Sequence, residues 1–323
     1  SSPTCSTPSS TRACATPEAR VTPRAQPAPS PGFVTDAAAR LAPSDSFWRQ
    51  AARRLRRRRP AMFSLAALLA MALLALFAPA LSPYAYDAQD FNIIGNPQAP
   101  SRVHPMGTDQ LGRDSFSRIL HGGRVSLSVG LLSALMAALI GTVVGAAAGY
   151  YGGTWDTLLM RAVDLALSIP ILPMMIVLAG IFRPSIALLI VIIGSFGWMG
   201  TARLVRSRFL SLRTAEYVEA SHALGGGASR VIFLHMLPNA LGPIVVATTL
   251  AVGNAIMLES ALSFLGLGVQ PPRPTWGNLL YEARDFLSLA PWMAVFPGLF
   301  ILVTVLAVNF LGDGLRDALD PKT

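Results

Sequence analysis

Few residues in this 323-residue sequence have the types and the spacing that chemistry requires. A glycine run occupies positions 225–227, but no Lys follows it to contact a phosphate, so we expect no ATP hydrolysis by this chain. His121, Gly122 and Gly123 are similar to an esterase oxyanion loop, yet no G-x-S-x-G stretch supplies a nucleophile. The sequence therefore predicts a protein without catalytic residues of its own.

A metal centre is not indicated either. The histidines are scattered, without the i, i+4 pairing or the carboxylate neighbours of a metal site; they are His104, His121, His222 and His235. Cys5 and Cys14 lie in a Ser/Thr/Pro/Ala-rich stretch with no histidine nearby, which supports neither a zinc site nor a disulfide framework. We expect this chain to bind no metal and no cofactor.

Glu259 is the clearest carboxylate inside an apolar stretch, in the segment MLESALSFLGLG. A charged group inside a membrane span is expensive to bury and usually functional, so Glu259 is a candidate pathway residue. The alternative is a carboxyl group that is hydrogen-bonded to a neighbouring helix or protonated. The sequence leaves both interpretations open.

The composition indicates the environment in which any such site must work. The chain is 52% hydrophobic and only 13% charged, with a mean hydropathy of +0.50, which is typical of a membrane protein and excludes a soluble globular fold. The net charge is +9, but residues 1–60 hold 11 Arg and 3 acidic residues, so the remainder is nearly neutral. That distribution predicts a membrane-topology signal and no nucleic-acid partner.

Apolar stretches recur from Met62 onward at lengths that match a hydrocarbon core of about 30 Å, which needs roughly 20 helical residues. Six spans are predicted, at residues 62–82, 125–149, 163–182, 185–202, 241–264 and 289–311. The arginine-rich stretch RRLRRRRP precedes the first span and favours a cytoplasmic N-terminus, and six spans return the C-terminus to the same side. The fold class is therefore an all-α polytopic membrane protein with both termini cytoplasmic.

The predicted organisation has three parts. Residues 1–45 contain too few large apolar side chains to offset the entropy of ordering, so they are expected to be a disordered tail. An organelle transit peptide or residues foreign to the native protein are alternatives for this tail. Residues 46–61 form a basic juxtamembrane segment, and residues 62–323 form the transmembrane domain.

Two spans carry special residues. Gly141, Gly145 and Gly149 recur at spacings of four, which predicts a ridge of small residues for close helix packing, with a ligand-contacting face as the alternative. Pro170 and Pro173 interrupt the third span near its predicted cytoplasmic end, where they should kink the helix. In the outer loop, residues 83–124, Asp114 is expected to cap a short amphipathic helix that displays Phe116, Ile119 and Leu120 and either contacts a partner or packs over the second span.

The polar segment 203–240 is expected to lie in the cytoplasm and to contain two short helices. Thr214 is the expected N-cap of the first, and Gly225 its terminator. The predicted helical stripe consists of Tyr217, Val218, Ser221 and Leu224. The second short helix, residues 231–236, should be stopped by Pro238 before the fifth span. An ordinary solvated loop is the alternative interpretation.

This segment closely resembles the signature of the inner-membrane permease subunits of binding-protein-dependent ABC importers. The signature reads E-A-A, three residues, Gly, nine residues, then I-x-L-P; the matching positions are Glu219, Ala220, Ser221, Gly225, His235, Leu237 and Pro238. Ser221 replaces the second Ala and His235 replaces Ile, and the H-x-L-P-N ending resembles the peptide-importer branch.

Further blocks resemble the second permease subunit of the dipeptide, oligopeptide and nickel branch. They are HPMGTDQLGRDSFSRILHGGRVSLSVG, AGYYGG, LESALSFLGLGVQPP, WGNLL, APW, FPG and GDGLRDALDP. The resemblance covers about residues 46–323, and several separate blocks in the expected order make it far more specific than one motif.

The resemblance implies a multi-pass permease of the bacterial inner membrane with the type I ABC importer fold. Its implied partners are a homologous permease, two cytoplasmic ATPase subunits that bind ATP and Mg, an extracytoplasmic solute-binding protein and the lipid bilayer. The implied ATPase-coupling residues are Glu216, Tyr217, Glu219, Ala220, Ser221, Leu224, Gly225, His235, Leu237 and Pro238. Peptide is the favoured substrate, and dipeptide, oligopeptide and nickel stay open.

Two other classes of protein compete with the importer. An ion-coupled secondary transporter would carry its own coupling chemistry, for which Glu259 alone is poor support, and no clear internal repeat is present. A non-transporting membrane scaffold is the third possibility. ATP-dependent uptake that needs added ATPase subunits would distinguish the importer from both.

Overall fold

The computed structural model describes residues 47–182 and 185–319. That part of the chain consists of helices and connecting loops, with one isolated β-bridge between Thr108 and Asp114. The predicted tail at 1–45, both cysteines and the turn residues Arg183 and Pro184 lie outside the described residues. The helices are α2 (Phe47–Arg57), α3 (Arg59–Leu76), α4 (Ala78–Leu81), α5 (Ser115–Tyr151), α6 (Gly153–Ser168), α7 (Ile171–Ile181), α8 (Ile186–Arg213), α9 (Glu216–Ala223), α10 (Ala228–Arg230), the π-helix η1 (Val231–Met236), α11 (Leu237–Phe264), α12 (Trp276–Ala283), the 3-10 helix η2 (Arg284–Phe286) and α13 (Trp292–Leu319).

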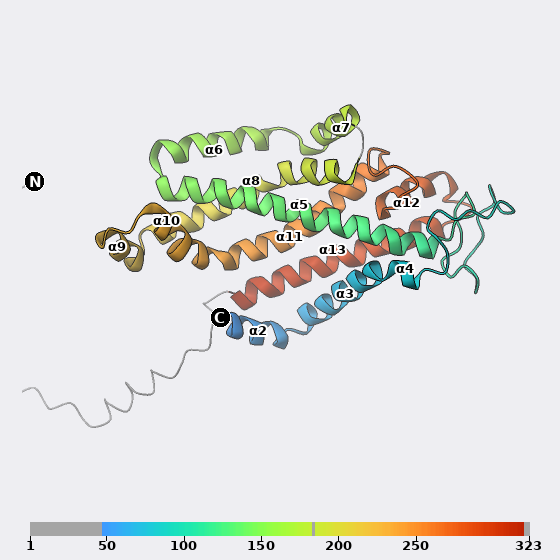
Figure 1. The fold of residues 1–323 in the computed structure, drawn as a ribbon, viewed down its shortest axis with the longest axis horizontal. Helices are drawn as coiled ribbons and strands as arrows, with labels where there is room; N and C mark the ends of the chain where they lie inside the picture. Colours follow the sequence, from blue (N-terminus) through green and yellow to red (C-terminus); the bar gives the residue numbers. More distant parts are fainter. Residues whose placement is uncertain (1–46, 183–184, 320–323) are drawn as a thin grey trace, which may run out of the picture. The chain divides into compact units, whose positions relative to one another are not determined.

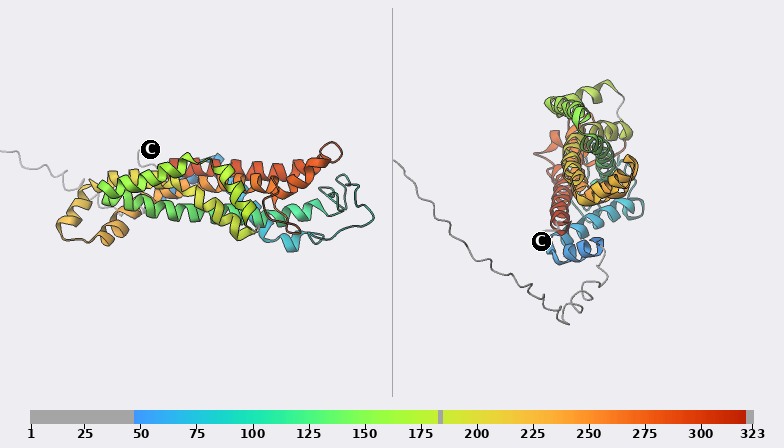
Figure 2. Two further views of the ribbon diagram at one scale, coloured as in Figure 1. Left: turned by 90° about the horizontal axis from the view of Figure 1, so that it is seen from above. Right: turned by 90° about the vertical axis from the view of Figure 1, so that its left-hand side faces the viewer.

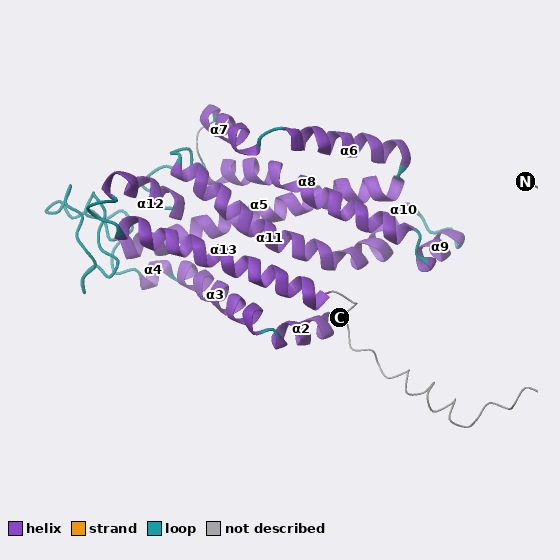
Figure 3. Ribbon diagram, turned by 180° about the vertical axis from the view of Figure 1, so that it is seen from behind, coloured by secondary structure: helices purple, strands orange, loops and turns teal. Residues whose placement is uncertain are grey.

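The long helices α5, α8, α11 and α13 run side by side, and α9 with α10 lies at one end of them while α12 and the loop 82–113 lie at the other (Figures 1 and 2). We call these the α9 end and the α12 end. Only helices and loops are drawn for the described residues (Figure 3). The prediction of an all-α polytopic membrane protein is confirmed.

Five helical stretches are long and apolar enough to cross a membrane, within the described residues: Arg59–Leu76, Ser115–Tyr151, Ile186–Arg213, Ala228–Phe264 and Trp292–Leu319. The pair α6 and α7 supplies a sixth span if the two are counted together, although they meet at an angle of 80°. The six predicted spans therefore correspond to five continuous helices and one broken pair.

The broken pair confirms that Pro170 interrupts the third span and corrects the position at which the helix before it begins. Ile169 and Pro170 adopt extended backbone angles between α6 and α7, as a proline that ends a helix requires. The helix begins at Gly153, ten residues before the predicted span, so the break follows 16 helical residues and does not lie near the start of the span. The sequence located the breaker correctly but missed the polar first turns of α6.

The fifth span corrects a second prediction, because Pro238 does not stop the helix before it. Helical structure continues from Ala228 to Phe264, and Pro238 lies in the first turn of α11. The preceding turn η1 is π-helical, and the Leu237 N–H donates to the carbonyl of Ile232. The wider π turn makes room for the proline ring, which would otherwise meet the carbonyl four residues earlier.

The glycine ridge of α5 lies against α8. A Cβ atom on Gly141 would approach the Thr201 side chain and the Trp198 carbonyl to 2.7 Å, which real Cβ atoms do not tolerate. Equivalent added atoms on Gly145 and Gly149 would meet the backbone and side chains of α8 about one and two helical turns along. The missing side chains let the backbones of α5 and α8 approach closely, which is how helices gain packing energy where lipid offers no hydrophobic drive.

The basic segment before the first span also folds. The helix α2 buries Ala51 and leaves its arginines at the surface. It packs against the last turns of α13, where a Cβ on Gly314 would lie 3.3 Å from Leu55 of α2 and would collide with Ala61 of α3. Arg58 pairs with Asp317 of α13 at 2.7 Å, with both side chains about half exposed. The start of the chain described here and its last helix are therefore joined.

Candidate functional site

The short helix α9 forms the tip of the α9 end, and one side chain anchors it. Val218 is fully buried in a cluster with Val205 and Phe209 of α8 and with Val231 and Met236 of η1. Because α8 leads into α9 and η1 leads into α11, this cluster attaches the tip to two long helices at once. A displacement of α9 would therefore move α8 and α11.

The start of α9 differs from the prediction. Thr214 is not its N-cap; the cap residue is Ala215, and no side chain caps the helix. Thr214 instead closes α8, which runs on to Arg213, and its hydroxyl donates to the carbonyl of Ser211 at 3.2 Å. Because α8 extends to Arg213, only Thr214 and Ala215 connect it to α9, and Ala215 takes the cap position.

The end of α9 is a Schellman motif centred on Gly225. The Gly225 N–H donates to the His222 carbonyl at 2.9 Å, and the Gly226 N–H donates to the Ser221 carbonyl at 2.9 Å. Gly225 has φ +78°, a left-handed conformation that costs other residues energy. The glycine at the signature position thus reverses the chain, and an added Cβ there would meet nothing within 4 Å.

The remaining residues of the signature gather on and around α9. Glu216, Tyr217, Glu219, Ala220, Leu224 and Pro238 are exposed, whereas Ser221, His235 and Leu237 are half-buried. Within the predicted stripe Val218 alone is buried, and Leu224 is 90% exposed. The tip therefore displays two carboxylates beside two large apolar side chains, a mixed surface typical of a protein–protein contact.

Glu259 is fully buried between α5 and α11. Its carboxylate accepts hydrogen bonds from Ser126 Oγ at 3.0 Å and from Ser263 Oγ at 2.8 Å. Ser126 Oγ also accepts from the backbone N–H of Trp276, the first residue of α12, at 3.2 Å. The carboxyl group thus links three helices, which favours the hydrogen-bonded interpretation over an exposed pathway residue.

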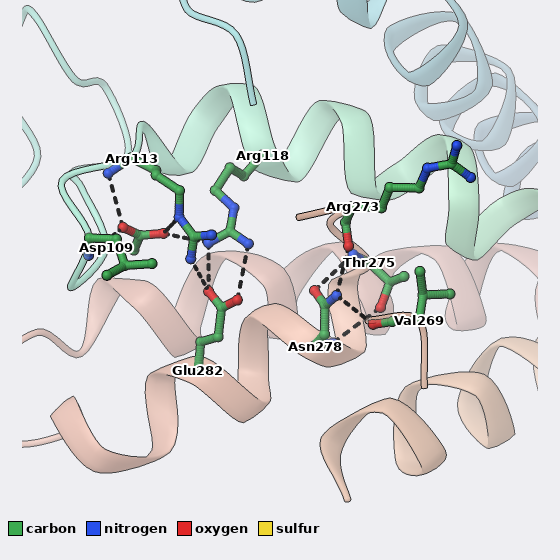
Figure 4. Close-up of polar contacts among 9 residues, drawn as sticks. Asp109, Arg113, Arg118, Val269, Arg273, Thr275, Asn278 and Glu282 are labelled. Carbon is green, nitrogen blue, oxygen red and sulfur yellow. Dashed lines mark hydrogen bonds and ion pairs between the residues drawn. The ribbon is translucent and has the colours of Figure 1, made fainter. Parts of the chain in front are cut away.

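The α12 end contains a buried charge cluster that sequence reasoning did not single out (Figure 4). It consists of Asp109, Arg113, Arg118 and Glu282. Arg113 contacts Asp109 at 2.7 Å and Glu282 at 2.8 Å, and Arg118 contacts the same two carboxylates. Two positive and two negative charges balance, so each buried charge is compensated by a partner.

The cluster holds a loop and a distant helix against the start of α5. Asp109 belongs to the loop, Arg118 to the second turn of α5, and Glu282 to α12. Next to it, α12 begins with a capping box in which Thr275 and Asn278 exchange side-chain and backbone hydrogen bonds (Figure 4). The sequence signal for the cluster was four charged residues among positions 109–118, shortly before an apolar span.

The short amphipathic helix predicted after Asp114 is not a separate element. Asp114 does cap a helix, since its side chain accepts from the Ser117 N–H at 2.8 Å, but that helix is the full 37-residue α5. Ile119 and Leu120 are 1% and 2% exposed, so they face the protein interior. The buried charge cluster allows the apolar helix to begin ten residues before the predicted span.

Among the described residues, no group of three or more His, Cys, Asp or Glu side chains is arranged to hold a metal ion. His104 contacts Asp114 at 3.0 Å, and His235 lies beside the ring of Tyr217. The histidines thus contribute to packing and hydrogen bonding at both ends of the described helices.

The sequence matches two described families. Residues 141–323 match the binding-protein-dependent transport system inner membrane component, and residues 46–100 match the N-terminal transmembrane domain of oligopeptide transport permease C. The chain is 44% identical over 277 residues to the oligopeptide transport system permease protein OppC of Escherichia coli, covering 86% of this chain and 92% of that protein. It is 42% identical over 280 residues to the dipeptide transport system permease protein DppC of Alkalihalophilus pseudofirmus, covering 85% and 90%.

The fold is similar to a solved transporter. A chain of the MetNI methionine ABC transporter, in an inward-facing conformation, superimposes with a TM-score of 0.51 and 19% sequence identity. The match covers 62% of this chain and 96% of that chain. This similarity confirms that the chain has the fold of an ABC importer permease, as the sequence predicted.

Proposed function

The chain belongs to the family of binding-protein-dependent transport system inner membrane components, and we propose that it is the permease subunit of an ATP-driven importer of short peptides. The relatives that match most of its length are named as dipeptide and oligopeptide transport permeases, and this supports peptide as the substrate class. The chain is a multi-pass protein of the inner membrane. As a permease subunit it forms part of a path and does not hydrolyse ATP.

The observation that carries the proposal is the exposed tip at the α9 end. A permease that draws on ATP hydrolysed by another subunit needs a rigid surface on which that subunit can push. The helix α9 exposes Glu219 and Leu224, is anchored through Val218, and ends in a fixed turn at Gly225. We infer that α9 inserts into a groove of a cytoplasmic ATPase subunit, as an amphipathic helix does in helix-in-groove recognition.

The proposed coupling follows from the anchoring. Closure of two ATPase subunits around ATP and Mg would shift α9, and the buried cluster around Val218 would carry the shift into α8 and α11. Rigid-body rocking of these spans would then open the path alternately to the two sides of the membrane. In this proposal the α9 end faces the cytoplasm, as do both termini.

The remaining proposed partners follow from what the chain lacks on its own. A homologous permease would complete the enclosure of a polar path, which one bundle of six spans does not surround. An extracytoplasmic solute-binding protein would deliver the peptide to the α12 end, where the charge cluster holds the loop 82–113 in place. ATP and Mg would bind to the ATPase subunits.

The test is ATP-dependent uptake of peptide by vesicles that contain the complete importer with a Glu219→Lys variant of this chain. We expect uptake to be abolished while membrane insertion is unchanged, because a reversed charge would face the ATPase groove. Asp313→Lys is the matched control, since Asp313 is also exposed but lies on α13, which is not part of the proposed contact. Normal uptake by the Glu219→Lys variant would contradict the coupling role, and the absence of any ATP-dependent peptide uptake by the wild type would contradict the function itself.

A further inference from the structure

A cavity of about 410 Å³ opens halfway along the long helices. Its walls come from α5, α6, α7, α8 and α11 and include Ser133, Ile171, Phe196, Gly200 and Asn254. The size falls within the range of about 300–1,000 Å³ that small-molecule pockets occupy. The cavity borders the break between α6 and α7, since Leu167 and Ile171 on either side of the break both line it.

The depth of the cavity places it far from both ends of the spans. Ser133 lies midway along α5, and Asn254 lies ten residues before the end of α11, about 15 Å at 1.5 Å per residue. A hydrocarbon core is about 30 Å thick, so Asn254 lies at the level of its middle. Whatever fills the cavity therefore does so inside the membrane.

Asn254 is the informative wall residue. It is exposed, and among the described residues nothing accepts from or donates to its side-chain amide. An amide that lacks hydrogen bonds in hydrocarbon costs several kcal/mol, so lipid chains are poor occupants of this surface. A peptide backbone offers the complementary donor and acceptor, an N–H and a C=O side by side.

Apart from Ser133, the rest of the wall is apolar. Ala134, Ala137, Phe196 and Met257 line it, and Gly200 lies open to the space, since an added Cβ would meet nothing within 4 Å. Ligand pockets commonly combine such apolar walls with a few polar groups that fix orientation. The wall thus offers room for an apolar side chain beside one amide that can hold a backbone.

We propose that this cavity receives an apolar side chain of the transported peptide during its passage, while the Asn254 amide hydrogen-bonds to the adjoining peptide backbone. The inference rests on the proposed function and adds to it a specificity site within the permease. The permease would therefore select among peptides by their side chains, in addition to any selection by a solute-binding protein.

The experiment measures uptake of two probes, trialanine and alanyl-leucyl-alanine, by vesicles containing the complete importer with either wild-type chain or Gly200→Val. An added Cβ on Gly200 would meet nothing within 4 Å, and valine takes up part of the cavity, so we expect uptake of the leucine peptide to fall about tenfold relative to trialanine. For each variant, the ratio of leucine-peptide uptake to trialanine uptake is compared with the wild-type ratio. All vesicles contain the same solute-binding protein, so its own selectivity affects both ratios equally. Gly180→Val on α7 is the matched control, because Gly180 is also open but lies outside the cavity wall, and it should leave the ratio unchanged.

A second variant, Asn254→Leu, tests the amide. We expect it to reduce uptake of both peptides about equally, with the ATPase subunits and the second permease still co-purifying. Rescue by Asn254→Gln, which retains the amide, would separate hydrogen bonding from packing.

The inference is overturned if Gly200→Val leaves the peptide ratio at the wild-type value while uptake continues. It is also overturned if either variant releases the second permease, because the cavity would then hold a partner helix, or if mass spectrometry finds a lipid that Gly200→Val displaces without changing the ratio. Absence of peptide uptake by the wild type would overturn the proposed function together with this inference.

Discussion

The α12 end and the α9 end of the described helices are held in opposite ways. At the α12 end, a loop and two helices meet around Asp109, Arg113, Arg118 and Glu282, whose ion pairs are buried. At the α9 end, one buried side chain, Val218, anchors a helix whose other signature residues are exposed or half-buried. The first arrangement is satisfied within this chain, and the second leaves most of the signature side chains at the surface.

Under the proposed function, the α12 end contributes stability and the α9 end contributes coupling. Buried charges are tolerable only when every one of them is paired, so the α12 end is fixed as a unit and resists partial opening. A short helix with a single anchor has little local stability. Segments that move when a partner binds are usually such regions of low local stability. The comparison predicts that substitutions at the α12 end lower stability, whereas substitutions at the α9 end lower coupling.

The largest expected effect is that of Arg118→Ala. It leaves Glu282 and Asp109 with one arginine between them in a buried site, which should cost about 3–5 kcal/mol. The midpoint of thermal unfolding in detergent should fall by roughly 10 °C. Arg284→Ala is the control, since Arg284 pairs with Asp285 at the surface and should change the midpoint little.

A double variant sharpens this prediction. Arg118→Met together with Glu282→Leu leaves the Arg113 and Asp109 pair balanced, so much of the lost stability should return. If the double variant were as unstable as the sum of its single changes, pairing would not be the reason for the stability of this end.

Val218→Ala should have the next largest effect, and on a different measurement. Removing two buried methyl groups costs about 1.6 kcal/mol, which we expect to appear as roughly tenfold weaker retention of the ATPase subunits. The unfolding midpoint should move far less than for Arg118→Ala. Val295→Ala, at a valine that is 59% exposed, is the control, and a large shift of the midpoint by Val218→Ala would erase the distinction between the two ends.

Gly225→Ala should follow, with a cost of about 1 kcal/mol because alanine must adopt φ +78°. The measurement is peptide-stimulated ATP hydrolysis by the complete importer, which we expect to fall severalfold. Gly227→Ala is the matched control, since Gly227 has φ −67° and equal room for a methyl group. Equal losses for the two variants would show that the left-handed turn is not what orients α9.

The smallest expected effect is that of Arg203→Gln. Arg203 pairs with Asp164 at 2.6 Å, but both side chains are about half exposed, so the change should cost less than about 1 kcal/mol. The unfolding midpoint is the measurement. A loss as large as that of Arg118→Ala would mean that pairing matters more than burial, contrary to the comparison of the two ends.

Local patterns in the sequence predicted much of the fold. The length of each apolar stretch predicted a span, Pro170 predicted the break between α6 and α7, and Asp114 and Gly225 predicted a helix start and a chain reversal. Each of these signals depends on residues within a few positions, so the sequence alone contains it. The resemblance of the 214–239 segment to the importer signature was likewise a local pattern.

Helix boundaries were less predictable. Thr214 was expected to begin α9 but closes α8, and Pro238 was expected to end a helix that in fact continues. Both errors concern how far a neighbouring helix extends, which packing decides. A cap or a breaker gives the local preference, and the buried cluster around Val218 or a π-helical turn overrides it.

The sequence by itself determined a membrane protein with about six spans, the family to which it belongs and the position of the segment that resembles the importer signature. Only the tertiary structure decided that Arg113 and Arg118 are buried and that the cavity opens beside Asn254. The hydrogen bond from Arg113 to Glu282 joins residues 169 positions apart. A charge enters the interior only when such a distant partner offsets its desolvation, and no local pattern records which partner that is.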